Sequence, residues 1–342
     1  MAGLEALARV GFAVPMRPSA AVTVLAAALA LALAGCSDRG RSASAKEPAS
    51  TKTRIRFQLD WVPQPEFGGL YAGLARGYFA AEGLDVQVLK GGASVAVPQL
   101  VANDKVEAGV MGADQLLAVR VKGGRLVAVY ATYQVSPRAL MVHDANPARS
   151  LEEVWRGQNP VAVEPGQSYV RWLTARYGTT PPTVPYQGAL AIFEGSPLLA
   201  QQCFISAEPV DMELLGKKVR TFPVAASGFS PYLGVVAVSE AFQAEHPEAV
   251  RALVRALRKG WTDYLADPGA FNPAIAAQNP AMSLAAMNRA AELDRPFIET
   301  QFTRRAGLGA MEESRWAELA RQLVEIKAIA RAPDLKGVFV GE

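Results

Sequence analysis

Residues 54–88 read RIRFQLDWVPQPEFGGLYAGLARGYFAAEGLDVQV, and this stretch alone indicates the structural class of the protein. Its first seven residues alternate polar and apolar side chains, which is the pattern of a half-buried strand. The prolines of the following VPQP end that strand, and residues 68–76 are then predicted to form a short helix. A second strand is predicted at residues 85–88. A strand, a helix and a second strand in this order predict a parallel βαβ unit.

The same alternation of strands and helices continues through the chain. Further strands are predicted at residues 108–111, 126–132, 161–163, 183–186, 203–205, 219–224 and 233–238. Helices are predicted at residues 95–103, 115–122, 167–177, 189–200, 247–267, 283–293 and 312–330. We therefore expect an α/β protein with parallel sheets, and a length of 342 residues suggests two domains.

The order of the strands predicts two α/β lobes, with the second inserted into the first. We expect the strand at 233–238 to return the chain to the first sheet. The first lobe would then comprise residues 54–142 and 233–342, and the second lobe residues 143–232. The two crossings between the lobes would act as hinges. A cleft between two domains is a preferred place for a ligand, so we expect the binding site there.

The N-terminal region has the features of an export signal. Two arginines precede an uncharged apolar run at residues 20–34, which is too short to cross a membrane but suits a signal peptide. The run ends in LAGC at residues 33–36, which resembles the lipobox of bacterial lipoproteins. We expect residues 1–35 to be a cleaved signal peptide, Cys36 to carry the lipid, and residues 36–53 to be a polar tether on the periplasmic or cell-surface side. An ordinary signal peptide with an incidental cysteine is the alternative.

Composition excludes several classes of protein. Half of the residues are hydrophobic and 20% are charged, which excludes a disordered chain. The formal net charge is only +3, so we expect no nucleic-acid partner. The only cysteines are Cys36 and Cys203, and there are two histidines, so we expect neither a disulfide framework nor a Cys/His zinc site. No sequence feature indicates a cofactor, and we expect a monomer.

Residues 58–64, QLDWVPQ, resemble the opening motif of periplasmic binding proteins for thiamine pyrimidine precursors. The motif continues with GLY at 69–71. The segments GYF at 77–79 and EGLDV at 82–86 are similar to the wider class that binds sulfonates, nitrate and taurine. The resemblance implies a type II periplasmic binding protein fold with its ligand cleft between two lobes. It also implies that a captured solute is delivered to an ABC permease in the inner membrane.

The sequence departs from the family pattern at informative positions. Gln64 stands where the pyrimidine binders usually have asparagine, and Phe67 stands where they usually have histidine. The yeast-type pyrimidine synthases of the same superfamily carry a cysteine-rich motif and a substrate histidine, and neither is found here. We therefore expect a binding protein for a small heteroaromatic solute such as a thiamine pyrimidine precursor, and not an enzyme. A sulfonate or taurine ligand, riboflavin, or a role as a periplasmic sensor are the alternatives.

Candidate ligand residues lie where strands are expected to end, because ligands of open α/β sheets bind beyond the carboxyl ends of strands. We expect Trp61 to stack on a flat ring and Glu208 to accept its N–H groups. The remaining candidates are Gln64, Tyr71, Gly112, Gln115, Gly166, Tyr169 and Tyr232. The four tyrosines at 71, 133, 169 and 232 are alternatives for the second face of the ring.

Structural roles compete with several of these assignments. Trp61 is also consistent with a wedge beneath the proline-rich loop, and Glu208 with a carboxylate that complements a helix dipole. Asp60 and Asp114 are expected to cap a turn and a helix. The loop containing Gly166, which opens a helix, is a candidate anion site or a plain connection.

Overall fold

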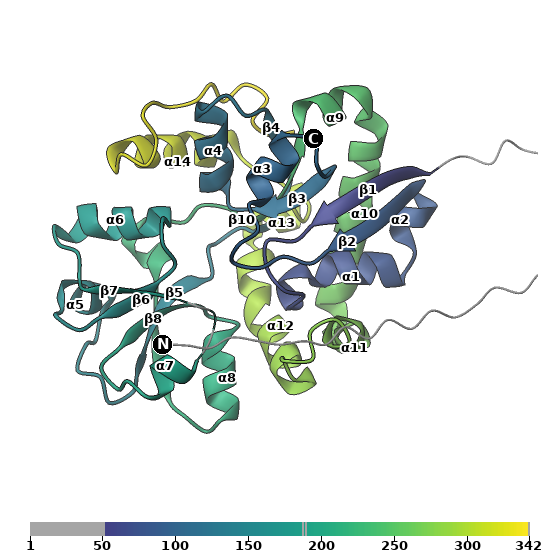
Figure 1. The fold of residues 1–342 in the computed structure, drawn as a ribbon. Coiled ribbons are helices and arrows are strands. Elements are labelled where there is room, and N and C mark those ends of the chain that lie inside the picture. The colour runs from purple at the N-terminus through teal and green to yellow at the C-terminus, as the bar shows by residue number, and fades with distance from the viewer. Residues whose placement is uncertain (1–51, 187, 189, 341–342) are drawn as a thin grey trace, which may run out of the picture. The chain divides into compact units, whose positions relative to one another are not determined.

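The protein is described by a computed structural model that covers residues 52–186, 188 and 190–340. Cys36, the expected signal peptide and nearly all of the expected tether lie outside the described residues. Two mixed five-stranded sheets, each covered by helices, form two lobes (Figure 1). We call them the first lobe and the second lobe in the order in which the chain enters them.

The sheet of the first lobe is built mostly from the N-terminal part of the chain. Its strands, in spatial order, are β2 (Leu84–Leu89), β1 (Thr53–Gln58), β3 (Ala108–Met111), β10 (Leu233–Ser239) and β4 (Leu126–Tyr133). Strand β10 shows why this sheet needs helices on both faces. Val236 and Val238 belong to the apolar cluster on one face, whereas Val235 and Ala237 belong to the cluster on the other, as expected because successive side chains of a strand point to opposite faces.

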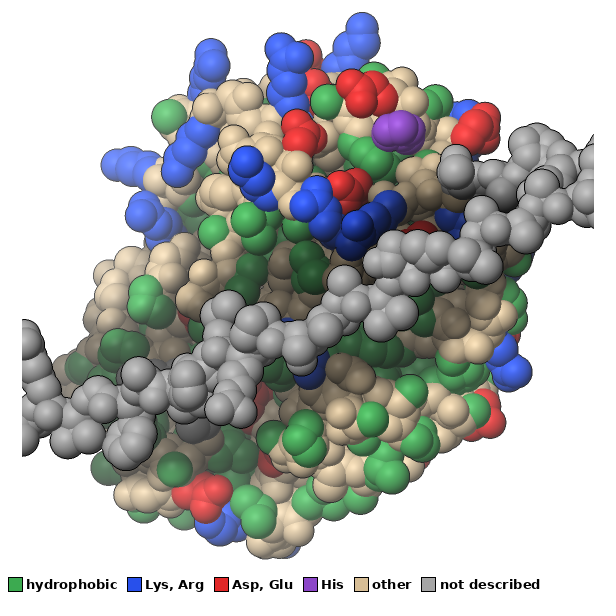
Figure 2. Space-filling model, turned by 45° about the vertical axis from the view of Figure 1, so that its right-hand side comes forward, with side chains coloured by type: hydrophobic (Ala, Val, Ile, Leu, Met, Phe, Trp, Pro, Cys, Tyr) green, Lys and Arg blue, Asp and Glu red, His purple; other side chains and the backbone are tan. Residues whose placement is uncertain are grey.

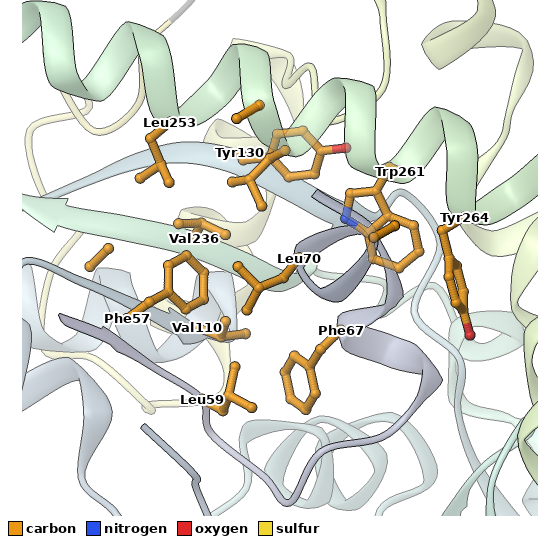
Figure 3. Close-up of a cluster of buried hydrophobic side chains, with 14 of the residues drawn as sticks. Phe57, Leu59, Phe67, Leu70, Val110, Tyr130, Val236, Leu253, Trp261 and Tyr264 are labelled. Carbon is orange, nitrogen blue, oxygen red and sulfur yellow. The ribbon is translucent and has the colours of Figure 1, made fainter. Parts of the chain in front are cut away.

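Helices of the first lobe cover both faces of this sheet. They are η1 (Pro65–Phe67), α1 (Gly68–Ala75), α2 (Tyr78–Ala81), α3 (Val97–Ala102), α4 (Ala113–Val121), α9 (Glu240–Glu245), α10 (Pro247–Ala266), η3 (Pro268–Ala270), α11 (Asn272–Ala276), α12 (Leu284–Ile298), α13 (Gln301–Ala306) and α14 (Glu313–Glu325). Helices α1 and α10 enclose one face. There, Leu253 of α10 lies above Val236 and Phe57 of the sheet, and Trp261 of α10 lies against α1 (Figure 3).

Glycines permit a very close crossing of α1 and α10. A Cβ atom added to Gly260 of α10 would lie 2.1 Å from the carbonyl oxygen of Gly69 in α1. In turn, a Cβ atom at Gly69 would lie 2.2 Å from the indole of Trp261, and one at Gly68 would overlap the ring of Tyr264. Both helices therefore need glycine here, because real Cβ atoms do not approach other atoms so closely.

The second lobe contains the other sheet. Its strands, in spatial order, are β7 (Thr183–Pro185), β6 (Val161–Val163), β8 (Ala200–Phe204), β5 (Arg138–His143) and β9 (Val219–Pro223). Its helices are α5 (Leu151–Arg156), α6 (Ser168–Tyr177), α7 (Ala191–Glu194), α8 (Glu208–Leu214) and η2 (Val224–Ser227). The helical segment over 189–200 was expected to be interrupted at Gly195 and Pro197, and its helical part is the single turn of α7.

The expectation of purely parallel sheets was wrong. Strand β10 runs antiparallel to β3 and β4, and β5 runs antiparallel to β8 and β9. These two strands are the ones by which the chain enters each sheet from the other lobe. The parallel strands end at the cleft, so a strand that arrives from the other lobe begins at the cleft and runs the opposite way.

The position of the first crossing also differs from the expected one. Strand β5 at Arg138–His143 belongs to the second sheet, so the chain leaves the first sheet between Tyr133 and Arg138 and not near residue 143. The sequence pattern missed β5 because its residues form a continuous buried run without alternation. The chain returns at Leu233, where β10 begins.

The last described residues close one edge of the first sheet. The backbone of Ala128 in β4 donates to Val338 and accepts from Val340, which forms a bridge alongside the strand. On the face shown in Figure 2, Lys and Arg side chains gather along the upper part and are mixed with carboxylates. No helix of the described residues is long and apolar enough to span a membrane.

Candidate functional site

A cleft with a volume of about 270 Å³ lies between the two sheets and is lined by both lobes. The first lobe contributes the residues that follow β1, the start of α4, the end of β4 and the start of β10. The second lobe contributes residues from the ends of β6, β7 and β8 and from the start of β5 and α8. The site is therefore located at the carboxyl ends of the parallel strands, as the topology requires.

Trp61 is half-buried in the first-lobe wall, directly after β1. The backbone of the second lobe comes close to its indole. A Cβ atom at Gly188 would lie 3.3 Å from Trp61 Cζ2, and Gly188 has a φ angle of +76°, which favours glycine. The indole thus borders the cleft, and both lobes already contact it.

Two carboxyl groups of the first lobe are recessed beside Trp61. Burial raises the pKa of Asp60 to about 6, although the backbone N–H groups of Asp60 and Trp61 and the charge of Arg138 oppose the shift. Burial also raises the pKa of Glu66 well above its usual range, and the neighbouring Asp60 adds to that shift. Among the described residues, Glu66 Oε1 is buried without a hydrogen-bond partner. The contact of Asp60 with local backbone agrees with the expected role in the turn.

Glu208 lies opposite these groups, at the first position of α8 in the second lobe. The Tyr186 hydroxyl donates to Glu208 Oε1, and the Phe204 backbone N–H donates to Oε2 at 3.0 Å. Burial raises the pKa of Glu208, and these hydrogen bonds counteract the rise. The carboxylate is therefore fixed in orientation, and each oxygen retains a lone pair for one more donor.

Arg138 supplies a positive charge in the middle of the cleft. Its guanidinium lies over the ring of Phe204, 5.2 Å from the centroid, and over the ring of Tyr169, 5.3 Å from the centroid. No carboxylate of the described residues lies within ion-pair distance of it, as the ion pairs of the described chain show. Stacking on two rings holds a guanidinium in place and leaves its N–H edge available.

A network of hydrogen bonds in the second lobe holds the residues that pack against Arg138. Gln202 Oε1 accepts from the Tyr169 hydroxyl at 2.8 Å and from the Glu164 backbone N–H at 2.6 Å. Gln167 Nε2 donates to Glu164 Oε2 at 2.7 Å. Tyr169 is buried and does not line the cleft itself, so it positions Arg138 through its ring and Gln202 through its hydroxyl.

Asp114 joins the two lobes across the cleft. The Ser168 hydroxyl, at the start of α6, donates to Asp114 Oδ2. The expectation that Asp114 caps α4 was wrong, because Gln115 has that role: its Oε1 accepts from the Gly112 backbone N–H at 3.0 Å. Asp294 of α12 makes a second contact of this type, with Ser206 of the second lobe, and burial raises the pKa of Asp294 to about 7.

The structure brings five of the nine predicted ligand residues together at the cleft. They are Trp61, Gln64, Gly112, Gln115 and Glu208. The other four do not line it. Tyr71 packs against the core of the first lobe, Gly166 is exposed in its loop, and Tyr232 is buried against Trp316 with Arg315 over its ring. The tyrosines that do border the cleft are Tyr133 and Tyr186.

Sequence reasoning missed three important cleft residues. Tyr186 directly follows β7, so the strand-end rule that selected Trp61 would also have selected it. Arg138 and Glu66 gave no comparable signal. Arg138 is the first residue of a strand that the sequence pattern missed, and Glu66 lies in a short 3₁₀ turn whose direction only the folded chain defines. No metal-binding cluster of His, Cys, Asp or Glu occurs among the described residues.

Comparison with known proteins adds independent information. A family model described as "NMT1/THI5 like" matches residues 64–270. The chain is 26% identical over 307 residues to the riboflavin-binding protein RibY of Chloroflexus aurantiacus, covering 85% of this chain and 86% of RibY. It is 24% identical over 250 residues to the 4-amino-5-hydroxymethyl-2-methylpyrimidine phosphate synthase of Candida albicans, covering 65% of this chain and 72% of the synthase.

Solved structures share the fold at low sequence identity. The alkanesulfonate-binding protein SsuA from Xanthomonas axonopodis pv. citri, bound to MOPS, superposes with a TM-score of 0.65 at 13% identity, covering 85% of this chain and 99% of SsuA. The two-lobed arrangement of mixed sheets seen here is therefore that of a periplasmic binding protein.

Proposed function

Because the chain belongs to the NMT1/THI5-like family, we propose that it is the solute-binding component of an ABC importer. In this role a solute enters the cleft, contacts both lobes and favours their closed arrangement, which the permease recognises. A solute shifts the equilibrium toward closure only if it binds the closed state more tightly than the open one. The cleft meets this condition, because Trp61 and Glu208 face it from opposite lobes.

We propose a small, N–H-rich heteroaromatic solute such as a thiamine pyrimidine precursor. The observation that carries this proposal is the charge of the cleft. Among the described lining residues there are six carboxyl side chains and one arginine: Asp60, Glu66, Asp114, Glu164, Glu208, Asp211 and Arg138. Carboxyl oxygens accept N–H groups whether or not the group is ionised, and those that are ionised repel an anion. The sulfonate and taurine alternatives are therefore disfavoured.

The roles proposed within the cleft are complementary. Trp61 stacks on the face of the ring, and Glu208 accepts an N–H group with an oxygen that Tyr186 and Phe204 have oriented. Gln64, Gly112 and Gln115 line the cleft at its first-lobe side. Tyr169 acts through Arg138 and Gln202, and Tyr71, Gly166 and Tyr232 do not line the cleft.

Riboflavin is the second candidate. It is supported by the similarity to RibY, which extends over most of both chains. A flavin has the same requirements as a pyrimidine precursor at one end, namely a flat ring with an N–H group. The ring system of a flavin is larger than that of a pyrimidine precursor. The lobes must therefore open further to admit a flavin.

We propose that the protein performs no catalysis. The cysteine-rich motif and the substrate histidine of the yeast-type synthases are not found in the sequence, and Phe67 lines the cleft wall. Cys203 also borders the cleft, but its thiol is buried near the Ala139 carbonyl oxygen, and burial raises its pKa well above the usual range. A thiol in this environment stays protonated and is a poor nucleophile.

Residues 1–53 complete the proposal. Export through a signal peptide at residues 1–35 and lipid attachment at Cys36 would keep the protein as a monomer on the periplasmic or cell-surface side, near the permease. Substitution of Cys36 by alanine should release the protein from membranes, as detergent partitioning would measure. A sensor that presents its ligand to a receptor uses the same binding step.

The direct test is identification of the ligand. Native mass spectrometry of the full chain purified in detergent should reveal a retained heteroaromatic compound, and tryptophan fluorescence should report its rebinding. Titration with 4-amino-5-hydroxymethyl-2-methylpyrimidine, riboflavin and taurine ranks the candidates. Binding of taurine alone would refute the proposed ligand class.

A further inference from the structure

Two groups in the cleft have hydrogen-bonding capacity that the described residues leave unused. Glu66 Oε1 is buried in the first-lobe wall and accepts no hydrogen bond from the described residues. Arg138, in the second-lobe part of the lining, is stacked on two rings, and no described carboxylate lies within ion-pair distance. Buried polar atoms are normally paired, so Glu66 Oε1 is an unused acceptor, and the N–H groups of half-buried Arg138 that do not meet Tyr169 are unused donors.

The two groups differ from the other charged residues of the cleft in their hydrogen bonds. Both oxygens of Glu208 already accept a hydrogen bond, from Tyr186 and from Phe204. Glu164 accepts from Gln167. Asp114 accepts from Ser168 across the cleft. Glu66 and Arg138 thus offer a bound solute hydrogen-bonding capacity in addition to the lone pairs that Glu208 retains.

We propose that Glu66 and Arg138 together recognise one edge of the bound ring, with Glu66 accepting an N–H group and Arg138 donating to an adjacent carbonyl oxygen or ring nitrogen. This rests on the proposed function and deepens it, because it defines the ligand as a ring with neighbouring donor and acceptor atoms. An aminopyrimidine has such an edge, and so does the imide of a flavin. A sulfonate has acceptors only.

Opposite lobes provide the two residues, which gives the pair a second consequence. A ring that meets both of them spans the cleft, so recognition of its edge and closure of the lobes are coupled. A ring that meets Glu66 alone contacts one wall and does not favour closure. The pair therefore makes closure of the lobes, and with it transport, as selective for the solute as binding is.

The test compares each probe with an analogue in which methyl groups replace the N–H. The two pairs are 4-amino-5-hydroxymethyl-2-methylpyrimidine with its 4-dimethylamino counterpart, and riboflavin with 3-methylriboflavin. The full chain in detergent should bind the N–H member of one pair at least roughly tenfold more tightly, because a site built for a hydrogen bond rejects the analogue that lacks it. Glu66→Leu should reduce this preference to within about twofold.

Conservative variants separate recognition from structure. Glu66→Gln keeps an acceptor oxygen and should retain most of the preference, whereas Glu245→Gln, exposed on α9, should behave as wild type. Arg138→Lys keeps the charge but not the planar donor edge, so affinity should fall roughly tenfold; Arg176→Lys, exposed on α6, is its control. Thermal unfolding of each variant establishes that it is folded.

The outcomes are distinct. If wild type binds one pair but Glu66→Leu keeps the full preference, or Arg138→Lys keeps the full affinity, the inference is wrong while the proposed function stands. Full affinity of Arg138→Lys would mean that Arg138 only balances the neighbouring carboxylates. If wild type binds neither pair, the proposed ligand class and the inference both fail.

Discussion

The ten residues from Gln64 to Gly73 supply two neighbouring regions of opposite character. Gln64, Glu66 and Phe67 border the cleft, where polar groups are recessed and one carboxyl oxygen is unpartnered. Immediately afterwards, Gly68 and Gly69 enter the α1–α10 crossing, where even a Cβ atom would find no space. The recessed polar groups of the first region lower the free energy of unfolding and serve binding. The close packing of the second region raises the free energy of unfolding.

The difference shows how a marginal free energy of unfolding is distributed over the molecule. Close-packed backbone and rings gain dispersion and hydrophobic energy, whereas recessed carboxyls lose hydration that only a ligand or a proton replaces. Substitutions at the crossing should therefore change stability, and substitutions at the cleft should change affinity. Four experiments test this separation.

The largest effect is expected at the crossing. Gly260→Val places a branched side chain against the Gly69 carbonyl oxygen, and backbone cannot move aside as a rotamer can. The free energy of unfolding should fall by at least about 4 kcal/mol, measured by urea denaturation and by soluble yield. Ala175→Val, exposed on α6, is the matched control and should be nearly neutral. A stable Gly260→Val variant would contradict the close crossing.

The next effect concerns a recessed acid behind the cleft. Because burial raises the pKa of Asp294 to about 7, the folded state binds a proton between about pH 4 and 7 that the unfolded state releases. Stability contributed by this group is therefore present at low pH and is lost as pH rises through 7.

Asp294→Asn removes this titration and should be more stable than wild type at pH 8, on the order of 2 kcal/mol, with little gain at pH 4. Urea denaturation at both pH values measures the difference. The cleft acids Asp60 and Glu66 remain in the variant, so part of the pH dependence should persist. A gain equal at both pH values would show that charge is not the cause.

At the cleft, Trp61→Ala should weaken the tightest ligand about tenfold, because an aromatic face and its buried area are lost. The unfolding temperature should change much less than in Gly260→Val, since the indole is only half-buried. Isothermal titration measures the affinity. Leu214→Ala, an exposed apolar side chain of the second lobe, is the control. Unchanged affinity would exclude stacking on Trp61.

The smallest effect is expected where the lobes meet. Ser168→Ala removes the hydrogen bond to Asp114 and should weaken ligand binding a few-fold, mainly through faster release, because the closed state loses one contact. Stopped-flow fluorescence measures the release rate, and Ser314→Ala on α14 is the control. Identical release rates would remove this contact from the account of closure.

Sequence patterns predicted most elements of the fold. The β1–α1–β2 unit, the buried β3 and the long amphipathic α10 were predicted within a few residues of their observed bounds. Strand direction was not predictable, because β5 and β10 differ from their neighbours only in where the chain comes from. A short apolar run has no polarity that would reveal this.

The cleft was predictable only in part. Trp61 and Glu208 each follow a strand or a strand end, so a topological rule located them. Arg138 and the Tyr186–Glu208 pair depend on contacts between residues that are tens of positions apart, which no local pattern contains. Tyr71 and Tyr232 were chosen by residue type, and burial in the core is the commoner fate of such side chains.

The position of β10 between β3 and β4 bears on the order in which the molecule is assembled. Because β10 lies between β3 and β4, the first sheet stays in two pieces until residue 239 is in place, after the whole second lobe has been made. The free edge of β4 is paired even later, when Val338 and Val340 bond to the backbone of Ala128. Pairings so distant along the chain form slowly. The first lobe to begin is thus the last to finish, and a chain interrupted before β10 keeps an open sheet that invites aggregation.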